Sequence, residues 1–312
     1  MNGETGTNGI VILEVIHGSR AFGLNEPDSD TDLKGILVGP SEWYGGFLPS
    51  PEQIEVSKDH VRYDIRKCFR LASEANPTAL ELIWAPADCI RVCTKAGSRI
   101  IEARRSFLSR RVSDSFGNYA ISQLKRIKTH RRWLLSPPKM EPVRSAFGLP
   151  ERSVISNDQI GAADILSRRG DLSDEMMMPN FLLMLDRERS YRAARREWQQ
   201  YHTWKQERNP KRAELEERYG YDTKHALHLV RLLRMSLEIL TTGVVVVRRP
   251  DREELLAIKR GDWPFERLIE YAESMQARIK SARDGSILPE EPDRVALNTL
   301  CTDIVREVSH GC

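Results

Sequence analysis

The chain has 312 residues, of which 40% are hydrophobic and 30% are charged, and its formal net charge is +3. This length suffices for one large globular domain or two ordinary ones. No segment approaches the about 20 consecutive apolar residues of a membrane-spanning helix, and residues 1–9 lack the basic and apolar parts of a signal peptide. The five cysteines are few, odd in number and scattered. We therefore expect a cytoplasmic protein with free thiols and no membrane span.

The two ends of the chain differ in charge. Residues 1–90 contain 7 Lys and Arg against 14 Asp and Glu, a net charge of −7, so residues 91–312 must carry +10 to give the total of +3. An acidic N-terminal part fits a metal site, and a basic remainder fits a polyanionic partner. The alternative is that the Arg-rich helices are simply exposed to water.

Apolar runs and turn residues predict an α/β region over residues 10–110. We expect strands at 11–16, 32–38 and 60–65, a short helix near 20–24 and a helix at 65–75. Asn76-Pro77 ends the second helix, because a residue before proline is displaced from the helical region. Another helix is expected at 78–84, with Asn76 or Thr78 as its N-cap. The visible strands are few, so the predicted sheet is small.

The pattern after residue 110 is mainly helical. A helix at 113–135 carries a basic run, and the Pro- and Gly-rich segment 136–180 predicts a long loop or insertion. The helix expected at 181–218 interleaves aromatic with basic side chains. That mixture fits either base stacking with phosphate contacts or aromatic packing in a core. Further helices are expected at 223–240, 251–260 and 264–283.

The pattern most specific to a function lies between Val11 and Val38. An apolar run leads into the turn His17-Gly18-Ser19, and Asp30-Thr31-Asp32 opens the next apolar run. Two carboxylates at i and i+2 of a strand project from one face, and their mutual repulsion usually indicates a divalent cation or a shared proton. A Gly-Ser turn offers backbone N–H groups and a hydroxyl to a phosphate. The combination indicates metal-assisted phosphoryl chemistry.

These residues resemble the signature of the DNA polymerase β-like nucleotidyltransferase superfamily, in which Gly18, Ser19, Asp30 and Asp32 match. The amino-acid sequence of this region is similar to the bacterial and phage branch associated with RNA-ligase repair operons. So are two further segments, one made of residues 63–67, Asn76-Pro77 and 80–82, and the other of residues 221–232. The resemblance implies an α/β (α+β) fold. A small mixed-sheet catalytic domain over 1–110 would precede a mostly helical nucleotide- or acceptor-binding domain over 111–312, with the insertion near 136–180.

The resemblance also implies the chemistry, in which a hydroxyl attacks the α-phosphate of an NTP and pyrophosphate leaves. Asp30 and Asp32 would hold two Mg²⁺ or Mn²⁺ ions. The third carboxylate is expected on a later strand, where Asp64 is our choice and Glu55 competes with it. The alternative role of Asp64 is that of a helix N-cap.

Several side chains are candidates for binding the nucleotide. Gly18 and Ser19 would hold the phosphates, Arg20 would add charge, and Ser29 would orient Asp30. Arg66 also lies within reach of a triphosphate in this interpretation.

Helix 223–240 has an apolar stripe on one side and three basic or titratable residues on the other, namely Lys224, His228 and Arg231. In the superfamily such a helix commonly supplies a cation to the triphosphate, and Lys224 is the first choice. The alternative is an ordinary solvent-facing surface.

Three functions follow from these patterns. The first is an active nucleotidyltransferase whose acceptor is an RNA end. The second keeps the reaction but modifies a protein, for example a toxin, or a small molecule. The third is a catalytically inactive nucleotide- or RNA-binding module.

Overall fold

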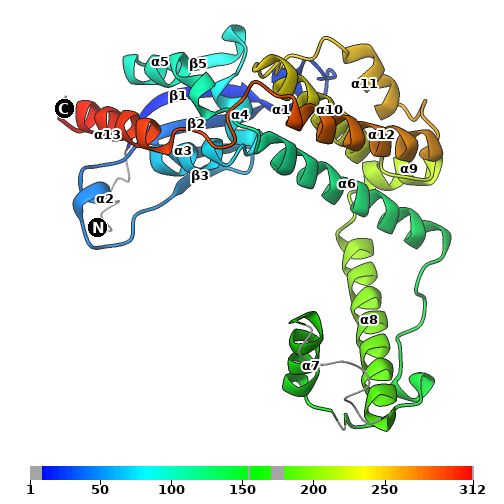
Figure 1. Cartoon of the computed structure of the whole chain (residues 1–312). Coiled ribbons are helices and arrows are strands. Elements are labelled where there is room, and N and C mark those ends of the chain that lie inside the picture. The colour runs from blue at the N-terminus through cyan, green and yellow to red at the C-terminus, as the bar shows by residue number, and fades with distance from the viewer. Residues whose placement is uncertain (1–8, 154, 170–178, 311–312) are drawn as a thin grey trace, which may run out of the picture. The chain divides into compact units, whose positions relative to one another are not determined.

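The computed structural model describes residues 9–153, 155–169 and 179–310. The chain forms two compact units (Figure 1). Unit 1 comprises Met1–Ile127 and Asp222–Cys312, and unit 2 comprises Lys128–Tyr221. None of the helices in the described ranges is long and apolar enough to cross a membrane. Four cysteines lie in those ranges and all have free thiols, as the sequence predicted.

Unit 1 is built on a five-stranded mixed sheet of order β3-β4-β2-β1-β5. The predicted strands are confirmed as β1 (Ile10–His17), β2 (Asp32–Val38) and β4 (His60–Asp64). Two edge strands were not predicted, β3 (Gln53–Ser57) and β5 (Ile90–Cys93). Both are short and largely exposed, so they lack the apolar pattern by which a buried strand is identified.

The register of the sheet places the functional motifs. β1 and β2 are antiparallel, with His17 opposite Asp32, so the Gly-Ser turn and the Asp pair lie at the same end. β2 and β4 are parallel, from Leu33 opposite His60 to Leu37 opposite Asp64. The start of β4 therefore lies beside the start of β2, and the end of β4, at Asp64, lies near the other end of β2.

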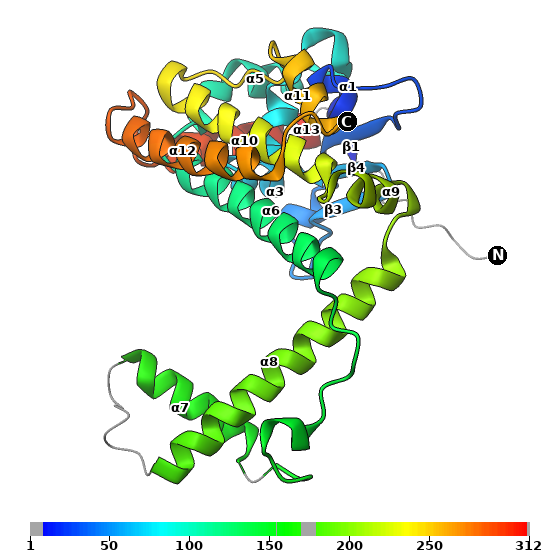
Figure 2. The same ribbon diagram turned by 90° about the vertical axis from the view of Figure 1, so that its right-hand side faces the viewer.

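Helices of unit 1 pack on this sheet and on each other. The first group comprises α1 (Gly18–Phe22), α2 (Glu42–Gly45), α3 (Ile65–Ser73), α4 (Pro77–Ile83), α5 (Lys95–Glu102) and α6 (Val112–Leu135), which continues into unit 2. The second group comprises α10 (Thr223–Thr242), α11 (Arg252–Lys259), α12 (Phe265–Asp284) and α13 (Arg294–His310). Two 3₁₀ turns lie at Ala87–Cys89 and Arg104–Phe107. α10 packs against α11 and α12 (Figure 2).

The apolar faces of the strands and helices form the core of unit 1. Ile12, Val15, Ile36, Ile65 and Leu80 are all fully buried. The predicted helix break is confirmed: α4 begins at Pro77, and the Asn76 side chain caps it by accepting a hydrogen bond from Ala79 N at 3.2 Å. α5 and α13 were not predicted.

Unit 2 differs from its prediction at two points. Its elements are a 3₁₀ turn at Arg144–Phe147, α7 (Asn157–Arg169), α8 (Pro179–Glu207) and α9 (Pro210–Tyr219). Of the long loop or insertion predicted over 136–180, the loop is wrong for residues 157–169, which form α7; residues 154 and 170–178 of that segment are outside the described ranges. The single helix expected at 181–218 is interrupted before Pro210, which cannot donate a backbone hydrogen bond.

The aromatic residues of unit 2 pack against one another. Trp133 lies edge-to-face on Tyr201 with ring centroids 5.9 Å apart, and Trp204 stands 5.4 Å from Trp133. Trp133 and Tyr201 are buried. Of the two interpretations of the aromatic and basic pattern, aromatic packing in a core therefore describes these residues.

Candidate active site

The Gly18-Ser19 turn lies against the carboxylate of Asp32. β1 ends at His17 and α1 begins at Gly18, whose φ of +66° is in the left-handed region that favours glycine. A Cβ atom on Gly18 would collide with Oδ2 of Asp32. Only glycine at this position allows the turn and the carboxylate to meet.

Replacing Gly18 with alanine is expected to lower the nucleotidyl transfer that the sequence predicts by about 100-fold or more, because the methyl group displaces the Asp32 carboxylate from its position. The left-handed backbone adds about 1 kcal/mol of strain to the folded state. Rates at saturating NTP and the free energy of unfolding measure the two effects. Gly45→Ala is the matched control, since nothing lies within 4 Å of the added atom. Wild-type activity in Gly18→Ala would contradict the expectation.

The segment that carries Asp30 is held by its own polar contacts. Arg20 donates from Nη2 to the carbonyl oxygen of Ser29 at 2.8 Å and from Nε to that of Asp30 at 3.3 Å. The Ser29 hydroxyl accepts from Glu26 N at 2.8 Å and closes a turn. The roles expected for Arg20 in phosphate binding and for Ser29 in orienting the Asp30 carboxylate stay predictions. Both residues shape the backbone before β2.

Asp64 does not share a site with Asp32. Asp64 is opposite Leu37, five positions along β2 from Asp32, which is about 16 Å at about 3.3 Å per residue. Its buried carboxylate accepts from Tyr44 Oη at 2.9 Å and from Arg66 N and Nε at 3.0 and 2.9 Å. The N-cap alternative therefore describes Asp64, and a metal ion held jointly with Asp32 is excluded by distance.

The expected phosphate contact of Arg66 is corrected for the same reason. Besides Asp64, its guanidinium donates to Trp43 O at 3.0 Å and to Ser50 Oγ at 2.8 Å. The hydroxyl of Tyr44 is ionised less readily, because burial and the neighbouring Asp64 both raise its pKa. These contacts fasten the segment between β2 and β3 to the start of α3.

The sheet brings the backbone of Asp59 level with that of Asp32, and the sequence interpretation did not consider Asp59. Its carbonyl oxygen accepts from Leu33 N at 2.7 Å, which aligns Asp59 with the first residue of β2. Glu55, the competing candidate, is exposed and receives a hydrogen bond from Gln53 at 2.9 Å. The sequence signal for the third carboxylate favours Asp64, which lies between Tyr63 and Ile65, whereas Asp59 lies between Lys58 and His60 and lacks that signal.

A buried polar cluster fixes the strand that follows Asp59. Glu14 on β1 accepts from His60 Nε2 and from Arg62 Nε on β4, each at 2.8 Å, across Gly35. Burial alone would raise the pKa of Glu14, but hydrogen bonds from Arg62 and His60 lower it below its usual value. The start of β4 is thereby tied to β1, which ends at His17, directly before Gly18.

The three candidate nucleotide-binding residues of α10 differ in exposure, so the alternative of an ordinary solvent-facing surface does not describe them as a group. Lys224 is exposed, His228 is half-buried and Arg231 is buried. Burial, followed by the charges of Arg231 and Lys224, lowers the pKa of His228 to about 3. His228 is therefore neutral near pH 7 and supplies no cation in this state, which leaves Lys224 as the exposed charge of the three.

Arg231 is engaged by Glu81 of α4. Arg231 Nη1 forms an ion pair with Glu81 Oε1, and His17 Nε2 lies 3.3 Å from Glu81 Oε2. Burial would raise the pKa of Glu81, but Arg231 and then His17 lower it to about 2. In the sequence, Glu81 is only part of a segment that resembles the family, and no role was predicted for it. Its partners are 64 positions before it and 150 positions after it (81 − 17 = 64; 231 − 81 = 150).

Lowering the pH is expected to reduce the free energy of unfolding of the wild type more than that of the Glu81→Gln variant. The folded pKa of Glu81, about 2, is below its ordinary value of 4.5, so the unfolded chain takes up the proton first as the pH falls. The ionised Glu81 carboxylate therefore adds about 3 kcal/mol to the free energy of unfolding. This stabilisation is fully present above about pH 4.5 and is lost as the pH approaches 2. Urea unfolding of both proteins between pH 5 and 2.5 measures it. Parallel pH dependences would contradict the expectation.

The donor set of the paired aspartates fits a hard cation. Within the described ranges, no three His, Cys, Asp or Glu side chains gather closely enough to form a complete metal site. Mg²⁺, however, is usually bound by one or two carboxylates together with substrate phosphates. Asp32 is half-buried against the turn and Asp30 is exposed. Their oxygens could therefore complete a site once a triphosphate lies on Gly18-Ser19.

Comparisons with known proteins agree with this geometry. Residues 4–135 match the family model RlaP, described as RNA repair pathway DNA polymerase beta family. The chain is 33% identical over 84 residues to the uncharacterized protein YcgL of Bacillus subtilis (strain 168); the match covers 26% of this chain and 32% of that relative, so the chain spans about a third of its length. It is 23% identical over 305 residues to an uncharacterized 38.9 kDa protein of Enterobacteria phage T4, from the nrdC-mobD intergenic region, covering 87% of this chain and 89% of that protein.

No solved structure matches the chain. The family match includes every residue of the Gly-Ser turn, the Asp pair and Asp59. The resemblance seen in the sequence is thus confirmed over residues 4–135, the segment that matches the model of the RNA repair pathway DNA polymerase beta family.

Proposed function

We propose that the protein is a cytoplasmic, metal-dependent nucleotidyltransferase that moves an NMP from an NTP to a hydroxyl group and releases pyrophosphate. The observation that carries this proposal is the contact between Gly18 and the Asp32 carboxylate, which joins a phosphate-binding turn to a metal-binding carboxylate. Residues 1–110 form the catalytic domain in this proposal. Residues 111–312 bind the nucleotide and the acceptor.

Each polar group at the site has a role in the proposed reaction. Backbone N–H groups of the turn and the Ser19 hydroxyl donate to the β- and γ-phosphates, with Lys224 as the candidate for an added positive charge. Asp30 and Asp32 hold the Mg²⁺ or Mn²⁺ ions, which would neutralise charge on the attacking and leaving oxygens. Asp59 replaces Asp64 as the third carboxylate and accepts the proton of the acceptor hydroxyl. That oxygen forms a bond to the α-phosphorus as the bond to pyrophosphate breaks.

An RNA end is the acceptor we favour. The family description refers to an RNA repair pathway. Charge supports the choice: Lys128–Tyr221 has 18 Lys and Arg against 14 Asp and Glu, a net +4, while the remaining residues have 30 against 31, a net −1. Arg195 and Arg196 of α8 are exposed. A protein or small-molecule acceptor, or a binding module without catalysis, are the alternatives that the test below separates.

Replacing Arg195 and Arg196 together with glutamine is expected to weaken RNA binding about tenfold near 0.1 M salt. Each lost phosphate contact also reduces the slope of log affinity against log salt by about 0.7 for a single strand. NTP affinity is expected to stay unchanged. The matched control is Arg294→Gln/Arg306→Gln, which removes two exposed arginines from α13 of unit 1. Equal RNA affinity of the two double variants would exclude α8 as an acceptor surface.

The proposed function is tested by label transfer. The protein is incubated with each α-labelled NTP, Mg²⁺ or Mn²⁺, and a pool of short RNAs and tRNA, beside an Asp30→Ala/Asp32→Ala control. Label entering RNA with the wild type alone supports the proposal and identifies the nucleotide. Label on a protein instead would identify a protein, not RNA, as the acceptor. No label on any macromolecule would favour the binding module without catalysis.

A further inference from the structure

One buried carboxylate, that of Glu81, contacts both β1, which leads into the proposed phosphate-binding turn, and α10. It lies on α4 and is 3% exposed. One oxygen is 3.3 Å from His17 Nε2 and the other pairs with Arg231 of α10. Within the described ranges, no hydrogen bond of good geometry reaches His17 Nε2 or Arg231 Nε, although both atoms are buried. The contact to Glu81 is therefore the interaction that best satisfies the His17 ring.

The partners of Glu81 bracket the turn and the short helix that follows it. His17 immediately precedes Gly18, and Phe22 is the last residue of α1. The His17 ring stands edge-on to Phe22 with centroids 5.8 Å apart, and the Arg231 guanidinium lies 3.8 Å from the Phe22 ring centroid. Glu81 thus holds the residue before the turn directly and the end of α1 through Arg231.

We infer that Glu81 is a positioning residue for the triphosphate: it acts through His17 to hold the Gly18-Ser19 backbone where phosphates bind. This inference rests on the proposed function. Glu81 is not a catalytic residue, since Arg231 and His17 occupy its carboxylate. A carboxylate that orients a ligand-binding group commonly changes affinity by about 10- to 100-fold when it is lost.

The experiment measures the affinity of the full chain for ATP, GTP, CTP and UTP with Mg²⁺ by titration calorimetry. The variants are Glu81→Gln, His17→Asn and the two combined. We expect each single variant to bind the preferred NTP about tenfold more weakly. The double variant is expected to be no weaker than either single variant, because both changes interrupt one pathway.

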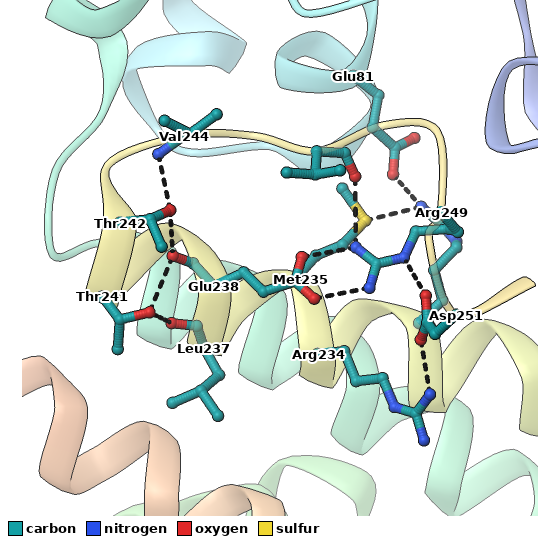
Figure 3. Close-up of polar contacts among 12 residues, drawn as sticks. Glu81, Arg234, Met235, Leu237, Glu238, Thr241, Thr242, Val244, Arg249 and Asp251 are labelled. Carbon is teal, nitrogen blue, oxygen red and sulfur yellow. Dashed lines mark hydrogen bonds and ion pairs between the residues drawn. The ribbon is translucent and has the colours of Figure 1, made fainter.

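Glu238→Gln is the matched control. Glu238 pairs with Arg249 at 2.6 and 2.7 Å, and Arg249 is 3% exposed, so a second buried arginine loses one of its two charged partners and keeps Asp251 at 2.8 Å. Figure 3 shows Glu238 of α10 paired with Arg249, which lies in the segment after α10, together with Glu81, Met235 and Asp251. The pair does not contact His17, so Glu238→Gln is expected to keep wild-type NTP affinity even where it lowers the melting temperature.

The outcomes separate the inference from the proposed function. Wild-type NTP affinity in Glu81→Gln would overturn the inference and leave the function intact. So would a loss of affinity in the double variant that equals the product of the two single losses. No binding of any NTP by the wild type would overturn both. If Glu81→Gln fails to fold, His17→Asn alone decides, because it leaves the Glu81–Arg231 pair in place: a tenfold loss supports the inference and wild-type affinity overturns it.

Discussion

Asp32→Asn is expected to lower nucleotidyl transfer by about 10³-fold or more. Asparagine has nearly the shape of aspartate and can keep the contact with Gly18, but it has no negative charge to hold a cation beside the phosphates. A metal ion contributes several kcal/mol of charge stabilisation in the transition state, and each 1.36 kcal/mol is a factor of ten in rate. Single-turnover rates at saturating NTP and Mg²⁺ measure the loss.

The fold of Asp32→Asn is expected to remain intact, since removing one of two neighbouring negative charges relieves repulsion in the free protein. Ligand-dependent stability then separates binding from folding: NTP with Mg²⁺ raises the melting temperature of the wild type and has a much smaller effect on the variant. Asp88→Asn is the control, because Asp88 is exposed and pairs with Arg248 on the surface. Transfer by Asp32→Asn at more than a tenth of the wild-type rate would exclude Asp32 as a metal ligand.

Asp59→Asn and Asp64→Asn are expected to have opposite effects. Asp59 is aligned with Asp32, so its loss is expected to lower transfer by about 100-fold, the lower end of the range for a general base, with little change in stability. Asp64 is buried and accepts from Tyr44 and Arg66, so its loss is expected to lower the free energy of unfolding by about 2 kcal/mol. Activity per folded molecule is expected to change little in Asp64→Asn.

Rates and urea unfolding curves of the two variants decide between these residues. Each variant serves as the control of the other, since both replace an aspartate of the β4 region with asparagine. If Asp64→Asn abolished transfer at full stability while Asp59→Asn was unaffected, the sequence-based choice of Asp64 would be correct and the register argument wrong.

Local patterns were sufficient for the central strands and most helices. β1, β2 and β4 have apolar runs bounded by turn residues, and α4 follows an Asn-Pro pair that both ends one helix and caps the next. Edge strands β3 and β5 bury little, so no such pattern exists for them. α7 lies among Pro and Gly residues, whose abundance in the segment concealed a helix stabilised by a small core of its own around Ile160 and Leu185.

The sequence alone was sufficient to propose the chemistry of the candidate site: Gly18, Ser19, Asp30 and Asp32 are close in the chain, and their types and spacing indicate phosphate and metal binding. Which distant side chains join them was decided only by the tertiary structure. The register of β4 aligns Asp59 rather than Asp64 with Asp32, and Glu81 meets Arg231 across 150 residues of chain. Such pairings depend on strand alignment and helix packing, and residue type at one position carries no information about either.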